Sequence, residues 1–221
     1  MRNALRDQLM EIKRKDDNIQ LIVGDIGFGV FENFEKQFSK DYLNIGICEA
    51  NMIGFASGLA SCNLIPIVYT IVPFLTMRAY EQIRVDIAMH KRKVILVGVG
   101  GGLAYGNLGP THHSFEDLSL MSILPNMSVY SPSQPSESKE SLKLAIENRD
   151  PSYIRLGKNG EPDLSKFMVE KYNDISIYNK KIDQTDMLVL TYGAITYECV
   201  LAGEIIKDKA KFSIASILRL K

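Results

Sequence analysis

The chain has 221 residues, 46% of them apolar, so it is long enough to bury a hydrophobic core. Basic and acidic side chains number 26 each, and this balance argues against nucleic acid or another polyanion as a partner. The charged opening segment is not expected to be a secretory signal, no apolar run has membrane-spanning length, and three cysteines without CxxC spacing are typical of reduced thiols in a cytoplasmic protein.

Apolar runs and turn residues alternate along most of the chain. An apolar stripe at Leu5, Leu9 and Ile12 predicts an opening helix, and residues 21–23 predict a strand. Further strands are predicted at 42–47, 65–70, 94–99, 128–130 and 152–156, with helices between them at 49–61, 74–90, 114–124 and 136–148. This alternation predicts an α/β domain over residues 1–157, with a parallel sheet covered by helices on both faces.

The rest of the chain is predicted to have a different organisation. Residues 158–186 are polar and contain the breaker cluster Asn159–Asp163, which predicts a linker. Residues 187–221 then predict one strand, one helix and one strand, at 187–192, 195–208 and 213–217. Such a unit buries too little surface to fold alone, so we expect it to dock on the first domain or to begin a second α/β domain.

The segment Asn44–Ala60 joins a short apolar strand to a single acid and a helix of small residues. Because glycine weakens a helix, Gly54 and Gly58 predict that another backbone or a flat ligand packs against this helix. Glu49 in its first turn would complement the helix dipole without any further role. However, its predicted apolar neighbours, Ile47 among them, favour a protonated acid and so indicate a chemical role.

Two other segments place polar or aromatic side chains after predicted strands. Asp25 lies in a Gly-Asp loop at the carboxyl end of a strand, where open parallel sheets bind their ligands. Phe74 is expected at the mouth between a strand and a helix, where its ring can stack on a ligand. Tyr80 has helical spacing from it and is equally compatible with a place in the core.

The glycine-rich stretch Gly100–His113 follows a buried strand. Its spacing does not satisfy the G-x-G-x-x-G pattern of dinucleotide-binding loops, and no helix follows at once. A long glycine loop that ends in Pro-Thr-His is instead typical of a backbone that approaches a substrate and presents His112 to it. Two adjacent histidines in such a loop, His112 and His113, are not expected in a core.

These segments, in this order, resemble the pyrimidine-binding domain of the transketolase family, whose members use thiamine diphosphate. The match is to Glu-x-x-Met-x-Gly from Glu49 and to Gly-Pro-Thr-His at residues 109–112. The resemblance implies that Glu49 hydrogen-bonds N1′ of the aminopyrimidine and that Phe74 stacks on this ring. It also implies cofactor contacts from Asp25, Ile47 and Tyr80.

The same resemblance implies a reaction and a set of substrate contacts. His112 is expected to contact the reacting oxygen, with His113 and Lys158 as further substrate residues, so that Glu49 and His112 are the expected catalytic pair. Single-chain transketolases carry Glu-Asp where this chain has Asn107-Leu108. We therefore expect two-carbon ketol transfer between sugars, with an acceptor that differs from ordinary pentose phosphates.

A thiamine enzyme also needs a diphosphate and Mg²⁺ site, which this chain is not expected to supply. Gly24-Asp25 is followed by Ile26 rather than glycine, and no second set of oxygen ligands accompanies it, so no metal ligand is predicted here. The resemblance therefore implies the carboxyl-terminal section of a two-chain transketolase, with Mg²⁺ held mainly by an amino-terminal section and self-association into a heterotetramer. The tail resembles the opening of the transketolase carboxyl-terminal domain.

Three alternatives remain at this stage. The beta subunit of a 2-oxo acid dehydrogenase component carries the same glutamate, but usually has Gln-His where this chain has Thr111-His112. A non-catalytic relative would keep the fold as a binding or assembly module. 1-Deoxyxylulose-5-phosphate synthase resembles the histidine loop too, but normally carries both cofactor domains in one chain, which the length of this chain disfavours.

Overall fold

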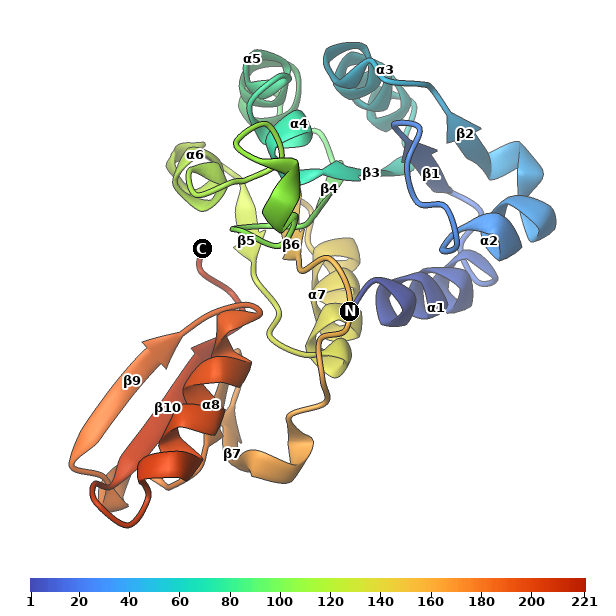
Figure 1. Cartoon of the computed structure of the whole chain (residues 1–221). Coiled ribbons are helices and arrows are strands. Elements are labelled where there is room, and N and C mark those ends of the chain that lie inside the picture. Colours follow the sequence, from blue (N-terminus) through green and yellow to red (C-terminus); the bar gives the residue numbers. More distant parts are fainter.

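A computed structural model of the chain describes residues 1–221 and contains a six-stranded and a four-stranded sheet (Figure 1). The larger sheet is parallel throughout, in the order β2-β1-β3-β4-β6-β5. Its strands are β1 (Ile19–Val23), β2 (Tyr42–Asn44), β3 (Ile65–Ile71), β4 (Ile95–Val99), β5 (Ser128–Tyr130) and β6 (Ser152–Leu156). The predicted α/β class with a parallel sheet is confirmed.

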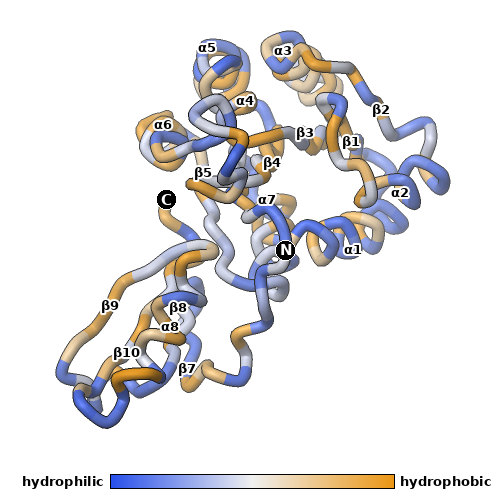
Figure 2. Tube along the Cα trace, viewed as in Figure 1, coloured by the Kyte–Doolittle hydropathy of each residue, from blue (hydrophilic) through white to orange (hydrophobic).

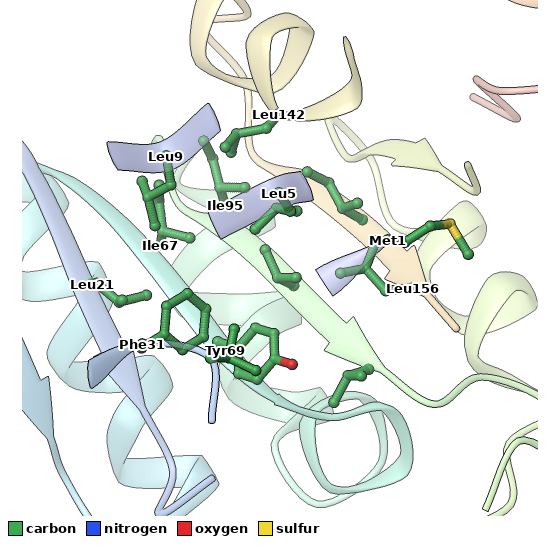
Figure 3. Packing of buried hydrophobic residues seen from close by; sticks show 14 of the residues in the cluster. Met1, Leu5, Leu9, Leu21, Phe31, Ile67, Tyr69, Ile95, Leu142 and Leu156 are labelled. Carbon is green, nitrogen blue, oxygen red and sulfur yellow. The ribbon is translucent and has the colours of Figure 1, made fainter. Parts of the chain in front are cut away.

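Helices cover both faces of this sheet because its strands are apolar on both sides. Ile67 and Tyr69 face one buried cluster and Val68 faces the other. The first cluster lies under α1 (Arg2–Lys13) and α7 (Pro135–Glu147), and Figure 3 shows side chains of both helices packed over the strands. The second lies under α3 (Glu49–Ser61), α4 (Val72–Thr76) and α6 (Asp117–Ile123) (Figure 1). None of the helices has both the length and the apolar character needed to cross a bilayer.

The helix predicted at 74–90 is divided in the structure. After α4 the chain forms α5 (Tyr80–Gln82) and the π-helical segment η2 (Ile83–Met89). Ala79, with φ −114° and ψ 19°, departs from helical dihedrals and separates the pieces. Two short elements that the sequence pattern does not predict, α2 (Glu32–Gln37) and η1 (Ser39–Asp41), lie between β1 and β2.

The smaller sheet has the order β7-β8-β10-β9, with β9 parallel and β8 antiparallel to β10. Its elements are η4 (Ser165–Phe167), β7 (Met168–Tyr172), β8 (Ile175–Tyr178), η5 (Ile182–Gln184), β9 (Met187–Thr191), α8 (Ile195–Ile206) and β10 (Phe212–Ile217). The predicted linker 158–186 thus contributes two strands, because β8 pairs with β10 and β7 with β8. A domain boundary at these residues stays a prediction.

The smaller sheet has little core of its own. Its buried cluster has four members, Leu164, Tyr178, Val200 and Ile214. Apolar side chains of β9 remain exposed. This strand forms the free edge of the sheet, and its trace has hydrophobic colours in Figure 2. The unit is therefore expected to depend on its attachment to the larger one.

Two sets of hydrogen bonds make that attachment. The backbone of Val129 in β5 accepts from the N–H of Leu220 at 2.8 Å and donates to the carbonyl of Lys221 at 3.1 Å. Glu137 on α7 is buried, and its carboxylate accepts from the Ser133 hydroxyl at 2.7 Å and from the Ser176 hydroxyl of β8 at 2.9 Å. The tail therefore docks on the first domain. This is one of the two outcomes that we expected from the sequence.

Candidate functional site

The parallel strands bring the predicted site residues to one edge of the larger sheet. Asp25 follows β1, Glu49 follows β2, Phe74 follows β3, His112 follows β4 and Lys158 follows β6. Because all five strands run in the same direction, their carboxyl ends meet at the same edge. Segments far apart in the sequence therefore share one surface.

Glu49 is the first residue of α3 and is only 4% exposed. One carboxylate oxygen, Oε2, lies 3.5 Å from Nη1 of Arg78. The other oxygen, Oε1, is buried and has no hydrogen-bond partner. Leaving such an atom unpaired costs about 1–3 kcal/mol, so this acid is positioned for a donor that the chain itself does not provide.

Phe74 in α4 is half-buried and lies beside both the ion-pair partner of Glu49 and a histidine. The guanidinium carbon of Arg78 is 3.8 Å from the centre of the Phe74 ring. On another side, the His112 ring meets the phenyl ring edge-on, with centroids 4.9 Å apart and planes inclined by 66°. Phe74 thus connects the acid of α3 to the glycine loop after β4.

The contacts continue from His112 to the end of β6. The Tyr105 ring lies 5.6 Å from the His112 ring, and Nζ of Lys158 lies 4.8 Å from the centre of Tyr105. Burial raises the pKa of Tyr105, so its phenol stays neutral at ordinary pH. We call this continuous set the edge row; it consists of Glu49, Arg78, Phe74, His112, Tyr105 and Lys158.

A buried carboxylate holds the loop that carries His112. Asp117 is fully buried and accepts from the Ser114 hydroxyl at 3.0 Å, the Tyr153 hydroxyl at 2.8 Å and Nε of Arg155 at 2.9 Å. The two ends of the loop are also joined directly, since Gly102 and Ser114 exchange backbone hydrogen bonds of 2.8 and 3.0 Å. Burial, and then the nearby Asp117 charge, raises the pKa of Tyr153, which keeps this phenol a donor.

Four predicted site residues lie outside the edge row. Asp25, with φ +52°, is bonded to Asn44, whose amide donates to its carboxylate at 3.1 Å. Tyr80 packs against the second buried cluster, and its hydroxyl donates to the Leu120 carbonyl at 3.4 Å. These contacts favour a place in the core over a contact with a ligand. Their cofactor contacts stay predictions.

Ile47 and His113 are the other two predicted site residues that lie outside the edge row. Ile47 is 71% exposed, because the turn at Gly46, with φ +80°, precedes it in the loop before α3. The expected apolar surroundings of Glu49 also include a cation, Arg78, and the cofactor contact of Ile47 stays a prediction. His113 bonds to the Gly106 carbonyl at 2.8 Å within its own loop, so its substrate contact also stays a prediction.

Two members of the edge row, Arg78 and Tyr105, were not predicted from the sequence. Arg78 follows Phe74 by four residues, a spacing that places side chains on one face of a helix and is the one signal that was present. Tyr105 lies in an irregular loop ahead of η3 (Gly106–Leu108), where no periodicity indicates a direction. Only the folded loop brings it against His112.

The two glycines of α3 have open space where a side chain would be. Gly54 and Gly58 are exposed, and a Cβ atom at either position would meet nothing within 4 Å. The predicted close approach of a backbone or ligand is therefore not made by any segment of this chain. It stays a prediction about a partner.

The edge row lies on an open surface rather than in a closed cavity. A cavity of about 380 Å³ adjoins Lys158, between the end of β6 and the start of α8, but Glu49, Phe74 and His112 do not line it. No group of three or more His, Cys, Asp or Glu side chains is placed to hold a metal ion. The row therefore offers an acid, aromatic rings, an imidazole and cations along one exposed edge.

Comparison with known proteins identifies the family of the chain. Residues 1–161 match the family described as Transketolase, pyrimidine binding domain. One subunit of the apulose-4-phosphate transketolase of Phocaeicola vulgatus is 29% identical over 214 residues, which cover 94% of this chain and 67% of that protein. A 6-deoxy-6-sulfo-D-fructose transketolase subunit of a Clostridium species is 29% identical over 208 residues, covering 92% of this chain and 63% of that one.

The fold has a solved counterpart as well. A split-gene transketolase, described as an inactive beta4 tetramer, superimposes with a TM-score of 0.83 at 28% identity, over 97% of this chain and 70% of that one. The chain spans about two thirds of the length of the two curated relatives.

Proposed function

This chain belongs to the transketolase family through its pyrimidine-binding domain, and from that premise we propose that it supplies the aminopyrimidine half of a thiamine diphosphate site. The proposed reaction is the transfer of a two-carbon ketol unit between sugars. A separate amino-terminal section would hold the diphosphate and Mg²⁺. The relatives named as subunits support a divided enzyme.

The unpartnered Oε1 of Glu49 carries this proposal. A buried acid whose Oε1 lacks a donor, joined through Arg78 to a half-buried phenyl ring, fits a flat heterocycle with a protonated ring nitrogen. The nitrogen would satisfy the carboxylate, and the Phe74 ring would add about 0.5–1.5 kcal/mol of stacking. Both groups belong to helices that begin at the carboxyl edge of the sheet, where such folds bind ligands.

Three residues of the edge row would then take part in the reaction. When bound, thiamine diphosphate would supply a carbanion at its thiazolium ring. Glu49 would hold the proton at the aminopyrimidine nitrogen, and His112 would donate to the reacting oxygen. Lys158 would attract an anionic group of the sugar, although its single ammonium binds such a group with less directional preference than arginine.

The open edge supports the need for a partner. Glu49, Phe74 and His112 line none of the main cavities of this chain, and no group of three or more potential metal ligands lies near them. A second chain placed over this edge would exclude water and bring the missing phosphate and metal contacts. We expect the chain alone to bind thiamine diphosphate poorly and the complex to bind it in a Mg²⁺-dependent manner.

Glu49→Gln tests the proposed function. Glutamine keeps the size of the side chain but cannot exchange a proton with the cofactor, so the complex with the partner chain should lose more than about tenfold in ketol transfer. Glu81→Gln, at an exposed acid of α5, is the matched control and should keep normal rates. Activity is measured as the rate of ketol transfer by the co-purified complex.

The same variant separates catalysis from assembly. The solved split-gene relative is an inactive tetramer, which favours a second candidate function as an assembly module. If Glu49→Gln and the unmodified chain assemble alike and neither complex binds thiamine diphosphate, the catalytic role is rejected in favour of this one.

A further inference from the structure

Arg78 contacts the two side chains that the proposed cofactor site depends on. Its guanidinium lies over the Phe74 ring at 3.8 Å, and its Nη1 lies 3.5 Å from Oε2 of Glu49. Glu49 begins α3, whereas Phe74 belongs to α4, so the two are otherwise set by different elements. One side chain therefore fixes the acid and the ring relative to each other.

The contact with Glu49 involves only one of its oxygens. Arg78 approaches Oε2, while Oε1 stays buried and unpartnered. A carboxylate with one oxygen held has its plane and its free oxygen defined. The guanidinium thus determines which oxygen of Glu49 remains available to a ligand.

The chemistry of arginine suits this double contact. A guanidinium is planar, so it can stack on an aromatic ring and still direct N–H groups sideways to a carboxylate. The ammonium of lysine is a compact charge on a flexible stem and cannot make both contacts with the same geometry. The Arg78 side chain is half exposed, so it reaches inward from the rim and does not serve as core packing.

We propose that Arg78 is a positioning residue that holds Glu49 and Phe74 in the arrangement that receives the aminopyrimidine ring. This inference rests on the proposed function, since it concerns the same site. The Arg78 guanidinium, a cation of this chain, would thus preorganise the site. Arg78 acts through Glu49 and Phe74 and is not assigned a contact with the substrate.

The affinity of Arg78 variants for thiamine diphosphate tests the proposal. In the complex with the partner chain, Arg78→Met should weaken thiamine diphosphate binding about tenfold, measured by calorimetric titration with Mg²⁺ present, because a charged hydrogen bond that orients the acid is lost. Arg78→Lys should give an intermediate affinity. Arg84→Met, at an exposed arginine nearby with no ion pair, should bind as the unmodified complex does.

A second measurement separates positioning from a general loss of structure. If Arg78 acts through the acid, Arg78→Met should weaken binding much less in a Glu49→Gln background, so the two effects should not add. Thermal unfolding of each variant chain checks that the fold is retained. Full additivity would overturn the proposed route through Glu49.

The remaining outcomes also decide the matter. Tighter binding by Arg78→Met would show that the guanidinium competes for the place of the pyrimidine ring, and equal binding would show that it is an ordinary surface residue. Either result rejects the positioning role while the proposed function stands. Absence of binding by the unmodified complex would reject both.

Discussion

At the scale of single residues, the site is defined by which polar atoms remain without a partner. Glu49 was expected among apolar groups, yet its neighbours include the cation of Arg78, and Ile47 points to solvent. The acid is nevertheless buried and keeps one oxygen free. The proposed role of Glu49 thus depends on its burial and on its position at the start of α3, whereas the groups around it differ from those expected.

The two adjacent histidines are predicted to differ in their effect on activity. His112 lies between the Phe74 and Tyr105 rings, whereas His113 is bonded to the Gly106 carbonyl. His112→Asn should therefore lower the rate of ketol transfer at saturating substrate by at least about 100-fold, the usual share of a general acid or base.

His113→Asn serves as the matched variant for this comparison. It should affect the stability of the loop more than the rate, with turnover falling by only a small factor. Steady-state kinetics of both complexes provide the measurement. Equal losses in the two variants would contradict separate roles.

At the scale of elements, the glycine loop between β4 and α6 is held by the side chains beneath it. Gly101 packs directly on Arg155, whose Nε would lie 2.4 Å from a Cβ atom at this position. The same Nε is bonded to Asp117, so the guanidinium is not free to move aside. The loop conformation that presents His112 therefore depends on the absence of a side chain at residue 101.

Gly101→Ala should destabilise the chain by about 1–3 kcal/mol, because the added methyl group overpacks the Arg155 contact. Urea unfolding of the variant chain measures this effect. In an Arg155→Met background the same substitution should cost clearly less, since the obstructing group is gone. An equal cost in both backgrounds would place the strain elsewhere.

At the scale of the whole molecule, the chain leaves one helix face without a partner. Gly54 and Gly58, on the helix that begins with Glu49, are exposed, and nothing within the chain packs on them. Because glycine in a helix interior is unfavourable, these positions are destabilising for the chain on its own. An interface that needs close approach of another backbone would explain them.

Gly54→Ala is predicted to act in opposite directions on the chain and on its assembly. The chain alone should become more stable by up to about 1 kcal/mol, measured by urea unfolding, since alanine favours the helix and meets no neighbour. Association with the partner or with a second copy should weaken, measured by sedimentation equilibrium. Unchanged association would place the interface on another face.

Much of the fold was predictable from local pattern. The larger sheet follows from apolar runs separated by turn residues, and β5 and β6 have the predicted bounds. The smaller sheet was harder to predict, because β7 and β8 are short strands within a polar stretch, and they are stabilised by the pairing of β8 with β10 and of β7 with β8 rather than by their own periodicity. The break near Ala79 in the helix predicted at 74–90 was likewise not predictable, because no helix-breaking residue lies there.

The sequence by itself predicted the family, through a resemblance, and the α/β architecture, through the alternation of apolar runs and turns, and both are confirmed. Glu49, Phe74 and His112 stay predicted site residues, each of which follows a strand of the larger sheet. How they meet became known only from the folded chain. Arg78 and Tyr105 join the row through contacts with residues distant in the chain, Glu49 and Lys158, whereas Tyr80 and His113 bond to backbone carbonyls instead. Side-chain direction depends on neighbours supplied by other strands and helices, and local pattern does not contain that information.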